Sequence, residues 1–272
     1  MTFPLEDVKV QVVQQTRRVS TPLLEDPWMA LNQNEFWMRV EGTASYYASH
    51  GRNVEVAVEE KADPATVNLY LQGSVFGAIL HQRSVLPLHG SSFYWKGKGI
   101  CICGETLAGK SSLSVAFCLD GATYLADDVT PVVMRNNKPL IFPRTGHAKL
   151  WKDSLDQLGL DASRLEGTGS DEAKYYQPLP QPVREPVPLD HIIILEVPDM
   201  GYLNRQTLTG IQAFTALRNQ IYRWEYLPAM PKTEANYLQQ LIDISKTVRI
   251  SRVIRPQNMG IAETRNYLTQ LI

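Results

Sequence analysis

A loop framed by two glycines and closed by lysine and serine constrains this chain more than any other feature. Residues 104–111 read Gly-Glu-Thr-Leu-Ala-Gly-Lys-Ser and fit G-x-x-x-x-G-K-[ST] at every defined position. Glycines let such a loop turn tightly and aim backbone N–H groups at phosphate oxygens. The motif predicts a nucleoside triphosphate site, with Lys110 bridging the β- and γ-phosphates and Ser111 holding Mg²⁺. The expected nucleotide contacts are Gly104, Glu105, Thr106, Leu107, Ala108, Gly109, Lys110, Ser111 and Ser112.

The stretches on either side of the loop have the order that a nucleotide site requires. An apolar strand runs directly into the loop, a helix follows it, and a second strand comes next. This alternation is typical of an α/β core. The expected elements are a hairpin of Ser91–Tyr94 and Gly99–Cys103, a helix at Ser111–Leu119 with Gly121 as its stop signal, and a strand at Thr123–Ala126.

Two adjacent aspartates, Asp127 and Asp128, follow the second strand. A phosphate loop needs an acidic partner for Mg²⁺, normally at the end of a neighbouring strand. Two neighbouring carboxylates resist ionising together unless a cation is close. The pattern favours one aspartate on the metal and the other accepting a proton from a substrate hydroxyl. The alternative is a turn at the end of the strand with two solvated aspartates. His89 is expected to orient one of the two carboxylates, and a purely structural role for this histidine also stays open.

The rest of the chain divides into a β-rich region, residues 1–84, and a nucleotide-binding domain, residues 85–272. The first region alternates in short runs that predict an antiparallel sheet and then a helix. A stretch rich in proline, glycine and charge, Gly167–Pro188, is expected to be a surface loop or lid. The remaining expected elements are strands at Asp7–Gln14, Phe36–Val40, Ala44–Ala48, Asn53–Val58, Leu189–Val197 and Val248–Ile254, and helices at Val67–Arg83, Ile211–Tyr222, Glu234–Ile244 (with Tyr237, Leu238, Leu241 and Ile242 on one side) and Ile261–Leu271.

Composition and charge argue against a nucleic-acid-binding, membrane-bound or secreted protein. The formal net charge of −1 gives no overall field toward nucleic acid or an anionic membrane, so neither is an expected partner. No apolar run is long enough to span a bilayer and no secretory signal begins the chain, which predicts a soluble, cytoplasmic protein. The three cysteines are expected to be reduced core residues, with Cys101 and Cys103 on one face of a strand.

Several of these segments together resemble a known family. His89-Gly90, the hairpin, the phosphate loop and Leu125-Ala126-Asp127-Asp128 resemble the catalytic domain of HPr kinase/phosphorylase. The resemblance implies an α/β fold: an HPr-kinase-like (PEP-carboxykinase-like) P-loop core with a mixed sheet flanked by helices, plus a β-rich N-terminal part. Further runs are similar to HPr-kinase-like proteins of peptide-modification clusters, including the lasso peptide kinases: Leu69-Tyr70-Leu71-Gln72-Gly73, Leu80-His81-Gln82-Arg83, Leu86-Pro87-Leu88-His89, Lys149-Leu150-Trp151, Lys174 and Val187-Pro188-Leu189.

The resemblance implies Mg²⁺-dependent transfer of the γ-phosphoryl group of ATP to a serine hydroxyl of a peptide or small protein. The glycine-rich segment associated with the family's phosphorylase half-reaction is not found in this sequence, so kinase activity alone is expected. It makes Asp128 the base that activates the hydroxyl, places Asp127 nearer the metal, and has His89 support Asp128. The residues it suggests for phosphate or substrate contact are Lys149, Lys174, Arg144 and Arg255.

The chain departs from the family pattern at the loop itself. Thr106-Leu107 stand where the family has Ser-Gly, so a positive φ at Leu107 would strain the backbone. Asp120-Gly121-Ala122 also replaces a basic Arg-Gly-His run. Two other functions stay open: a kinase of a small hydroxylated metabolite, and a nucleotide-binding regulator without transfer activity. Self-association into a homo-oligomer stays open as well.

Overall fold

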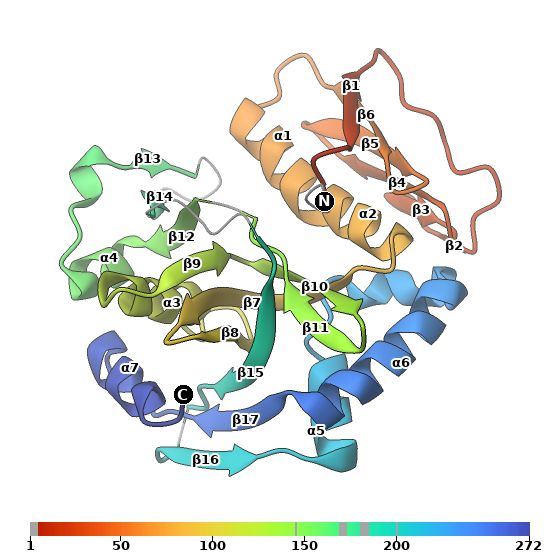
Figure 1. Cartoon of the computed structure of the whole chain (residues 1–272). Helices are drawn as coiled ribbons and strands as arrows, with labels where there is room; N and C mark the ends of the chain where they lie inside the picture. Colours follow the sequence, from red (N-terminus) through yellow and green to blue (C-terminus); the bar gives the residue numbers. More distant parts are fainter. Residues whose placement is uncertain (1–4, 145, 169–172, 180–184, 200) are drawn as a thin grey trace. The chain divides into compact units, whose positions relative to one another are not determined.

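The computed structural model describes residues 5–144, 146–168, 173–179, 185–199 and 201–272 (Figure 1). The chain divides into two compact units. The first joins residues Met1–Pro87 to Ile221–Gln240, and the second joins Leu88–Gln220 to Leu241–Ile272. The described helices include none that is long and apolar enough to cross a bilayer.

The first unit contains a six-stranded sheet in the order β1-β6-β5-β4-β3-β2. The expected antiparallel pairing holds for every neighbouring pair except β1 and β6, which run parallel. That part of the prediction is wrong because β2 lies at the opposite edge of the sheet, so β1 and β2 do not form a hairpin. The strands are β1 (Lys9–Val12), β2 (Leu24–Glu25), β3 (Met29–Leu31), β4 (Glu35–Val40), β5 (Ala44–Ser49) and β6 (Asn53–Val58).

The helix expected at Val67–Arg83 is longer and interrupted. It begins with α1 (Pro64–Tyr70), passes through a π-helical turn at Leu71–Val75, and continues as α2 (Phe76–Gln82). It starts early because the Asp63 side chain caps the free backbone N–H groups of Ala65 and Thr66, at 3.2 and 2.9 Å.

Buried His81 ties the segment 221–240 into the first unit. Its ring nitrogens contact the Tyr237 hydroxyl at 3.1 Å and the Tyr222 carbonyl at 2.9 Å. Burial lowers the pKa of His81 to about 4, although backbone groups of Tyr222 and Arg223 oppose that shift. His81 is therefore a neutral, structural histidine at pH 7.

The second unit contains an eight-stranded mixed sheet, which confirms the mixed α/β class. Its path is β11-β10-β7-β8-β15-β17-β16, with β9 paired to β7. The central strands β8, β15 and β17 are parallel, so their carboxyl ends meet at one edge. The strands are β7 (Leu86–Trp95), β8 (Lys98–Gly104), β9 (Thr123–Ala126), β10 (Val129–Arg135), β11 (Lys138–Ile141), β15 (Val187–Glu196), β16 (Asn204–Thr207) and β17 (Arg249–Ile254).

Helices α3 (Lys110–Leu119) and α7 (Ile261–Thr269) pack against this sheet. Phe117 of α3 stacks on Phe93 of β7 with ring centroids 4.6 Å apart. Cys101 and Cys103 are buried on β8 and are free thiols, as expected. Burial and its hydrogen bond to Cys101 keep the pKa of Cys103 well above its ordinary value, with the hydrogen bond the larger cause.

The stretch Gly167–Pro188 is not one loop. Within it β14 (Lys174–Pro178) pairs with β12 (His147–Trp151) and β13 (Glu166–Gly167), forming a three-stranded sheet. The loop prediction is wrong there because prolines are tolerated at strand ends, such as Pro178. The parts of the stretch at 169–172 and 180–184 lie outside the described residues. A short helix, α4 (Lys152–Leu158), and a 3₁₀ turn at Ala162–Arg164 connect β12 to β13.

The later helices lie close to their expected places. They are α5 (Gly210–Arg218), a 3₁₀ turn at Trp224–Ala229, and α6 (Pro231–Thr247). On α6, Tyr237 and Leu241 are buried, but Leu238 and Ile242 are 45% and 37% exposed. The expected four-residue apolar side was wrong because residues 238 and 242 stand one position, roughly 100°, further round the helix.

Candidate nucleotide site

The phosphate loop joins the carboxyl end of β8 to the amino end of α3. Gly104 has φ +145° and Gly109 has φ +94°, backbone conformations that side-chain-bearing residues rarely adopt. A Cβ added at Gly104 would lie 2.4 Å from the Leu195 carbonyl oxygen of neighbouring β15. Both glycines are therefore required by the backbone. Among the described residues, no side chain caps the start of α3, where the first N–H groups of a helix lack partners within it and can bind an anion.

Leu107 adopts the positive φ that was expected to strain the backbone at this position. Its φ is +69°, in the left-handed region, and its side chain is 72% exposed. A leucine there costs about 1–2 kcal/mol relative to glycine because Cβ crowds the following carbonyl. The loop thus holds strain at the point where the resembling family carries glycine.

Replacing Leu107 with glycine is expected to raise the free energy of unfolding by about 1 kcal/mol, because the strained φ is already present in the protein without nucleotide and glycine removes the strain. Leu107→Ala is the matched control, because it removes the exposed apolar side chain but keeps the Cβ that causes the strain. Urea unfolding measures the stability of both variants. Equal free energies of unfolding would show that residue 107 does not strain the backbone.

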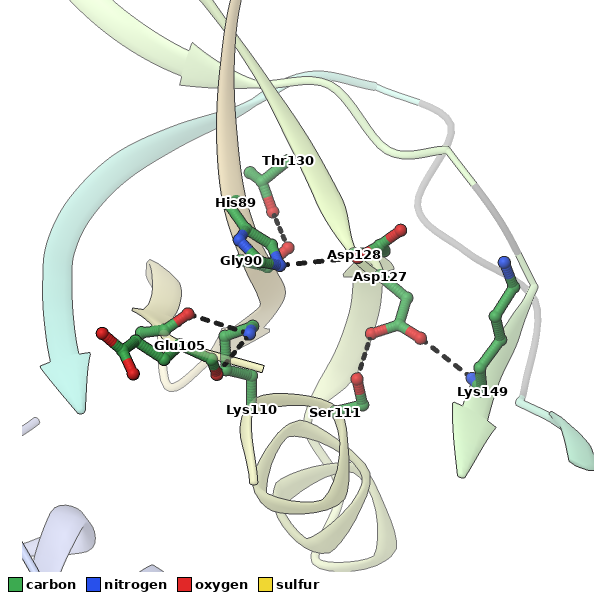
Figure 2. Close-up of polar contacts among 10 residues, drawn as sticks. His89, Gly90, Glu105, Lys110, Ser111, Asp127, Asp128, Thr130 and Lys149 are labelled. Carbon is green, nitrogen blue, oxygen red and sulfur yellow. Dashed lines mark hydrogen bonds and ion pairs between the residues drawn. The ribbon is translucent and has the colours of Figure 1, made fainter. Parts of the chain in front are cut away.

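Lys110 is buried and spans the loop from inside (Figure 2). Its Nζ donates to the carbonyl oxygens of Gly104 and Glu105, each at 2.9 Å. Burial lowers the pKa of Lys110, and the charges of Asp128, Cys103 and Asp127 oppose that shift. Its ammonium group is held at the loop, where phosphate oxygens could replace the two carbonyls as acceptors.

Asp127 lies opposite the start of α3 and uses both carboxylate oxygens. Oδ1 accepts from the Ser111 hydroxyl at 2.6 Å, and Oδ2 accepts from the backbone N–H of Lys149 at 2.9 Å (Figure 2). Strand β9 carries Asp127 to this point because it pairs with β7, beside the strand that ends in the loop. The two residues expected to hold Mg²⁺ are thus in contact.

Asp128 turns away from Asp127 toward His89. Its φ of +64° is left-handed, and its carbonyl accepts from the Gly90 N–H at 3.1 Å. His89 Nε2 lies 3.6 Å from Asp128 Oδ1, and the Asp128 side chain is half exposed (Figure 2). His89 and Gly90 lie within β7 rather than before it, because that strand starts at Leu86. The two aspartates therefore have different partners and different access to solvent.

The oxygen atoms at Ser111 and Asp127 suit a hard divalent cation. A hydroxyl and a carboxylate 2.6 Å apart, beside a phosphate loop, match the ligand set of a Mg²⁺ that also takes phosphate and water oxygens. Within the described ranges, no group of three or more His, Cys, Asp or Glu side chains is placed to hold a metal by itself. These residues fit a cation that arrives with a nucleotide.

The remaining candidates are distributed around this centre. Arg255 lies at the loop, where its guanidinium donates to the Ala108 carbonyl at 3.3 Å and to the Met259 carbonyl at 2.8 Å. The Ser112 hydroxyl instead donates to Ser154 at 2.9 Å, so its side chain is committed to packing α3 on α4. Arg144 contacts β9 through its backbone N–H, which donates to the Leu125 carbonyl at 2.7 Å.

Sequence reasoning missed the residues that position the aspartates. Thr130 donates to the Gly90 carbonyl at 3.0 Å and so fixes the backbone that holds Asp128. Lys149 was suggested for phosphate or substrate contact, which stays a prediction, but the contact of its backbone N–H with Asp127 was not predicted. No side-chain pattern signals a backbone contact, so only the strand pairing could have located it.

Comparison with known proteins finds similarity among solved structures. No family model matches the chain, and no curated protein matches it. The solved structures that it resembles include the Hpr(Ser) kinase/phosphatase from Coxiella burnetii, at 18% identity over 68% of this chain and 97% of that one. The TM-score is 0.36, which is too low to equate the two folds. Function is therefore inferred from the residues of the site.

Proposed function

We propose that this chain is an HPr-kinase-like, ATP-dependent kinase that phosphorylates a serine hydroxyl of a peptide or small protein, as lasso peptide kinases do. The supporting observation is that the two aspartates have different partners and different exposure to solvent. Asp127 is bound to Ser111 beside the phosphate loop, whereas Asp128 is half exposed and faces His89. One carboxylate at a metal position and one free to accept a proton are what phosphoryl transfer to an alcohol needs.

The residues of the loop would bind and orient the triphosphate. Lys110 and the N–H groups at the start of α3 would neutralise the β- and γ-phosphates, while Arg255 braces the loop from behind through the Ala108 carbonyl. Such catalysis consists mainly of positioning and charge stabilisation.

Asp128 would accept the proton of the acceptor hydroxyl as its oxygen attacks the γ-phosphorus. The bond from that phosphorus to the β–γ bridging oxygen breaks, so the products are a phosphoserine and ADP. His89, 3.6 Å from Asp128, would hold the carboxylate in place. A Mg²⁺ held by Ser111 and Asp127 would supply charge neutralisation at the phosphates.

A nucleotide-binding regulator without transfer activity is the second candidate. The strained, exposed Leu107 favours it, since a loop that carries strain at its tip can bind nucleotide without organising it for chemistry.

Incubation of the full chain with Mg²⁺ and ATP labelled at the γ-phosphate would decide between these functions. A pool of synthetic serine peptides serves as acceptor, the same pool with alanine for serine is the control, and glycerol represents small alcohols. We expect label in the serine peptides alone. Label in glycerol alone would point to a metabolite kinase, and ATP binding without any labelled product would support the regulator.

A further inference from the structure

The small sheet of β12, β13 and β14 has one buried face and one outward face. Ala148, Leu150 and Tyr175 pack into the core with α3 and α4. Because successive residues of a strand point to opposite sides, the alternate positions face outward. The cross-strand register places Lys149 opposite Tyr176 and Trp151 opposite Lys174. We call the outward set the lysine–aromatic face: His147, Lys149, Trp151, Lys174 and Tyr176.

The two lysines of this face are held over aromatic rings. Lys149 Nζ lies 6.0 Å from the centre of the Tyr176 ring, and Lys174 Nζ lies 5.1 Å from that of Trp151. His147 meets Tyr176 edge-on, with ring centroids 4.9 Å apart. Among the described residues, neither lysine forms an ion pair with a carboxylate. Both cations are thus preorganised and keep their capacity to bind an anion.

The face borders the reacting end of the nucleotide site. The Lys149 N–H donates to Asp127 Oδ2, and the other oxygen of Asp127 binds Ser111. In Figure 2 the Lys149 side chain extends from the far side of Asp127, away from the phosphate loop. The triphosphate is expected at the loop and a metal at Ser111 and Asp127, so β12 borders the site on the side of Asp127.

Charge on the face favours an anionic partner. Two lysines lie on the face, and two carboxylates of the described residues lie beside it. Asp127 is expected to bind the metal, which leaves Glu166, placed by the register opposite Tyr176 on β13. Burial and the charge of Lys149 lower the pKa of His147, so the histidine adds no further positive charge at pH 7. The ring surfaces of Trp151 and Tyr176 can pack against a peptide backbone beside the ion pairs.

We propose that the lysine–aromatic face binds acidic side chains of the peptide acceptor that flank its phosphorylated serine. The inference rests on the proposed kinase function and adds the class of peptide that the site selects. Lys149 and Lys174 are its specificity-determining residues, through charge-assisted contacts to aspartate or glutamate.

Binding of two labelled peptides to the full chain tests this inference without any transfer step. Gly-Asp-Ser-Asp-Gly and Gly-Asn-Ser-Asn-Gly, both with blocked termini, are compared by fluorescence anisotropy in the absence of nucleotide. We expect the acidic peptide to bind about fivefold more tightly at low salt, as one to two exposed ion pairs would give. The double variant Lys149→Gln/Lys174→Gln should lose that preference.

The control is Lys138→Gln/Lys246→Gln, which removes the same charge from exposed lysines elsewhere in the second unit and should keep the preference. Equal binding of the two peptides to the unchanged protein would overturn the inference. So would a loss of ATP affinity in Lys149→Gln/Lys174→Gln with peptide binding intact, because the lysines would then serve the nucleotide phosphates. Labelled ATP transfer is scored separately, so failure of the kinase proposal stays distinguishable from failure of this one.

Discussion

Replacing Lys110 with alanine is expected to lower the rate of phosphoryl transfer by about 10²–10³-fold, the usual cost of removing one preorganised group that stabilises developing charge. The structure adds a second effect. The ammonium group of Lys110 is buried and bonds to the carbonyls of Gly104 and Glu105, so its loss also leaves the loop less ordered. ATP affinity should fall together with the rate. Initial rates with γ-labelled ATP and calorimetric titration measure the two effects separately.

Lys98→Ala provides a matched control at the other end of the same strand. Lys98 begins β8, and its ammonium group bonds to the Ile272 carbonyl. Its removal changes the net charge equally while leaving the loop intact. If Lys110→Ala transferred phosphate at the rate of Lys98→Ala, the loop would not be the phosphate site and the proposed function would fail.

The parts of the fold that the sequence predicted well are those with a local cause. The strand Thr123–Ala126 and the helix after the loop have the expected positions, because glycine loops and stop signals act over a few neighbouring residues. The contact between Ser111 and Asp127 could be expected from the motif and the strand order together. The strain at Leu107 could also be stated in advance, since it depends only on φ and the presence of Cβ.

The parts that could not be predicted depend on contacts between distant residues. The segment 221–240 joins the first unit through buried His81 and Tyr237, which nothing near either residue indicates. Arg255 reaches the loop because β17 runs parallel to β15, so both strands end at the same edge as β8. The turn of Asp128 toward His89 depends on a left-handed φ that the Gly90 N–H helps to fix.

That left-handed backbone makes Asp128→Asn the sharpest test of chemistry at this site. Asparagine tolerates positive φ as well as aspartate does, so the variant should keep the backbone at φ +64° and lose only the charge. Without a carboxylate to accept the hydroxyl proton, the transfer rate should fall by roughly 10²–10⁴-fold. ATP affinity should stay close to that of the unchanged protein, because Asp128 pairs with His89 and, in the part of the chain that the structure describes, forms no hydrogen bond or ion pair with the loop.

Asp127→Asn separates the two aspartates. An amide at position 127 can still face Ser111 and Lys149, but it is a poorer ligand for a hard divalent cation, so ATP affinity should lose its dependence on Mg²⁺. The transfer rate and the ATP affinity of each variant are measured with and without Mg²⁺ and compared with those of the unchanged protein. If Asp128→Asn lost ATP affinity as well as transfer, Asp128 would act on the nucleotide and the base would have to be sought elsewhere. We expect Asp128→Asn to lose only phosphoryl transfer and Asp127→Asn to lose the Mg²⁺ dependence of ATP binding, because the two aspartates have different partners.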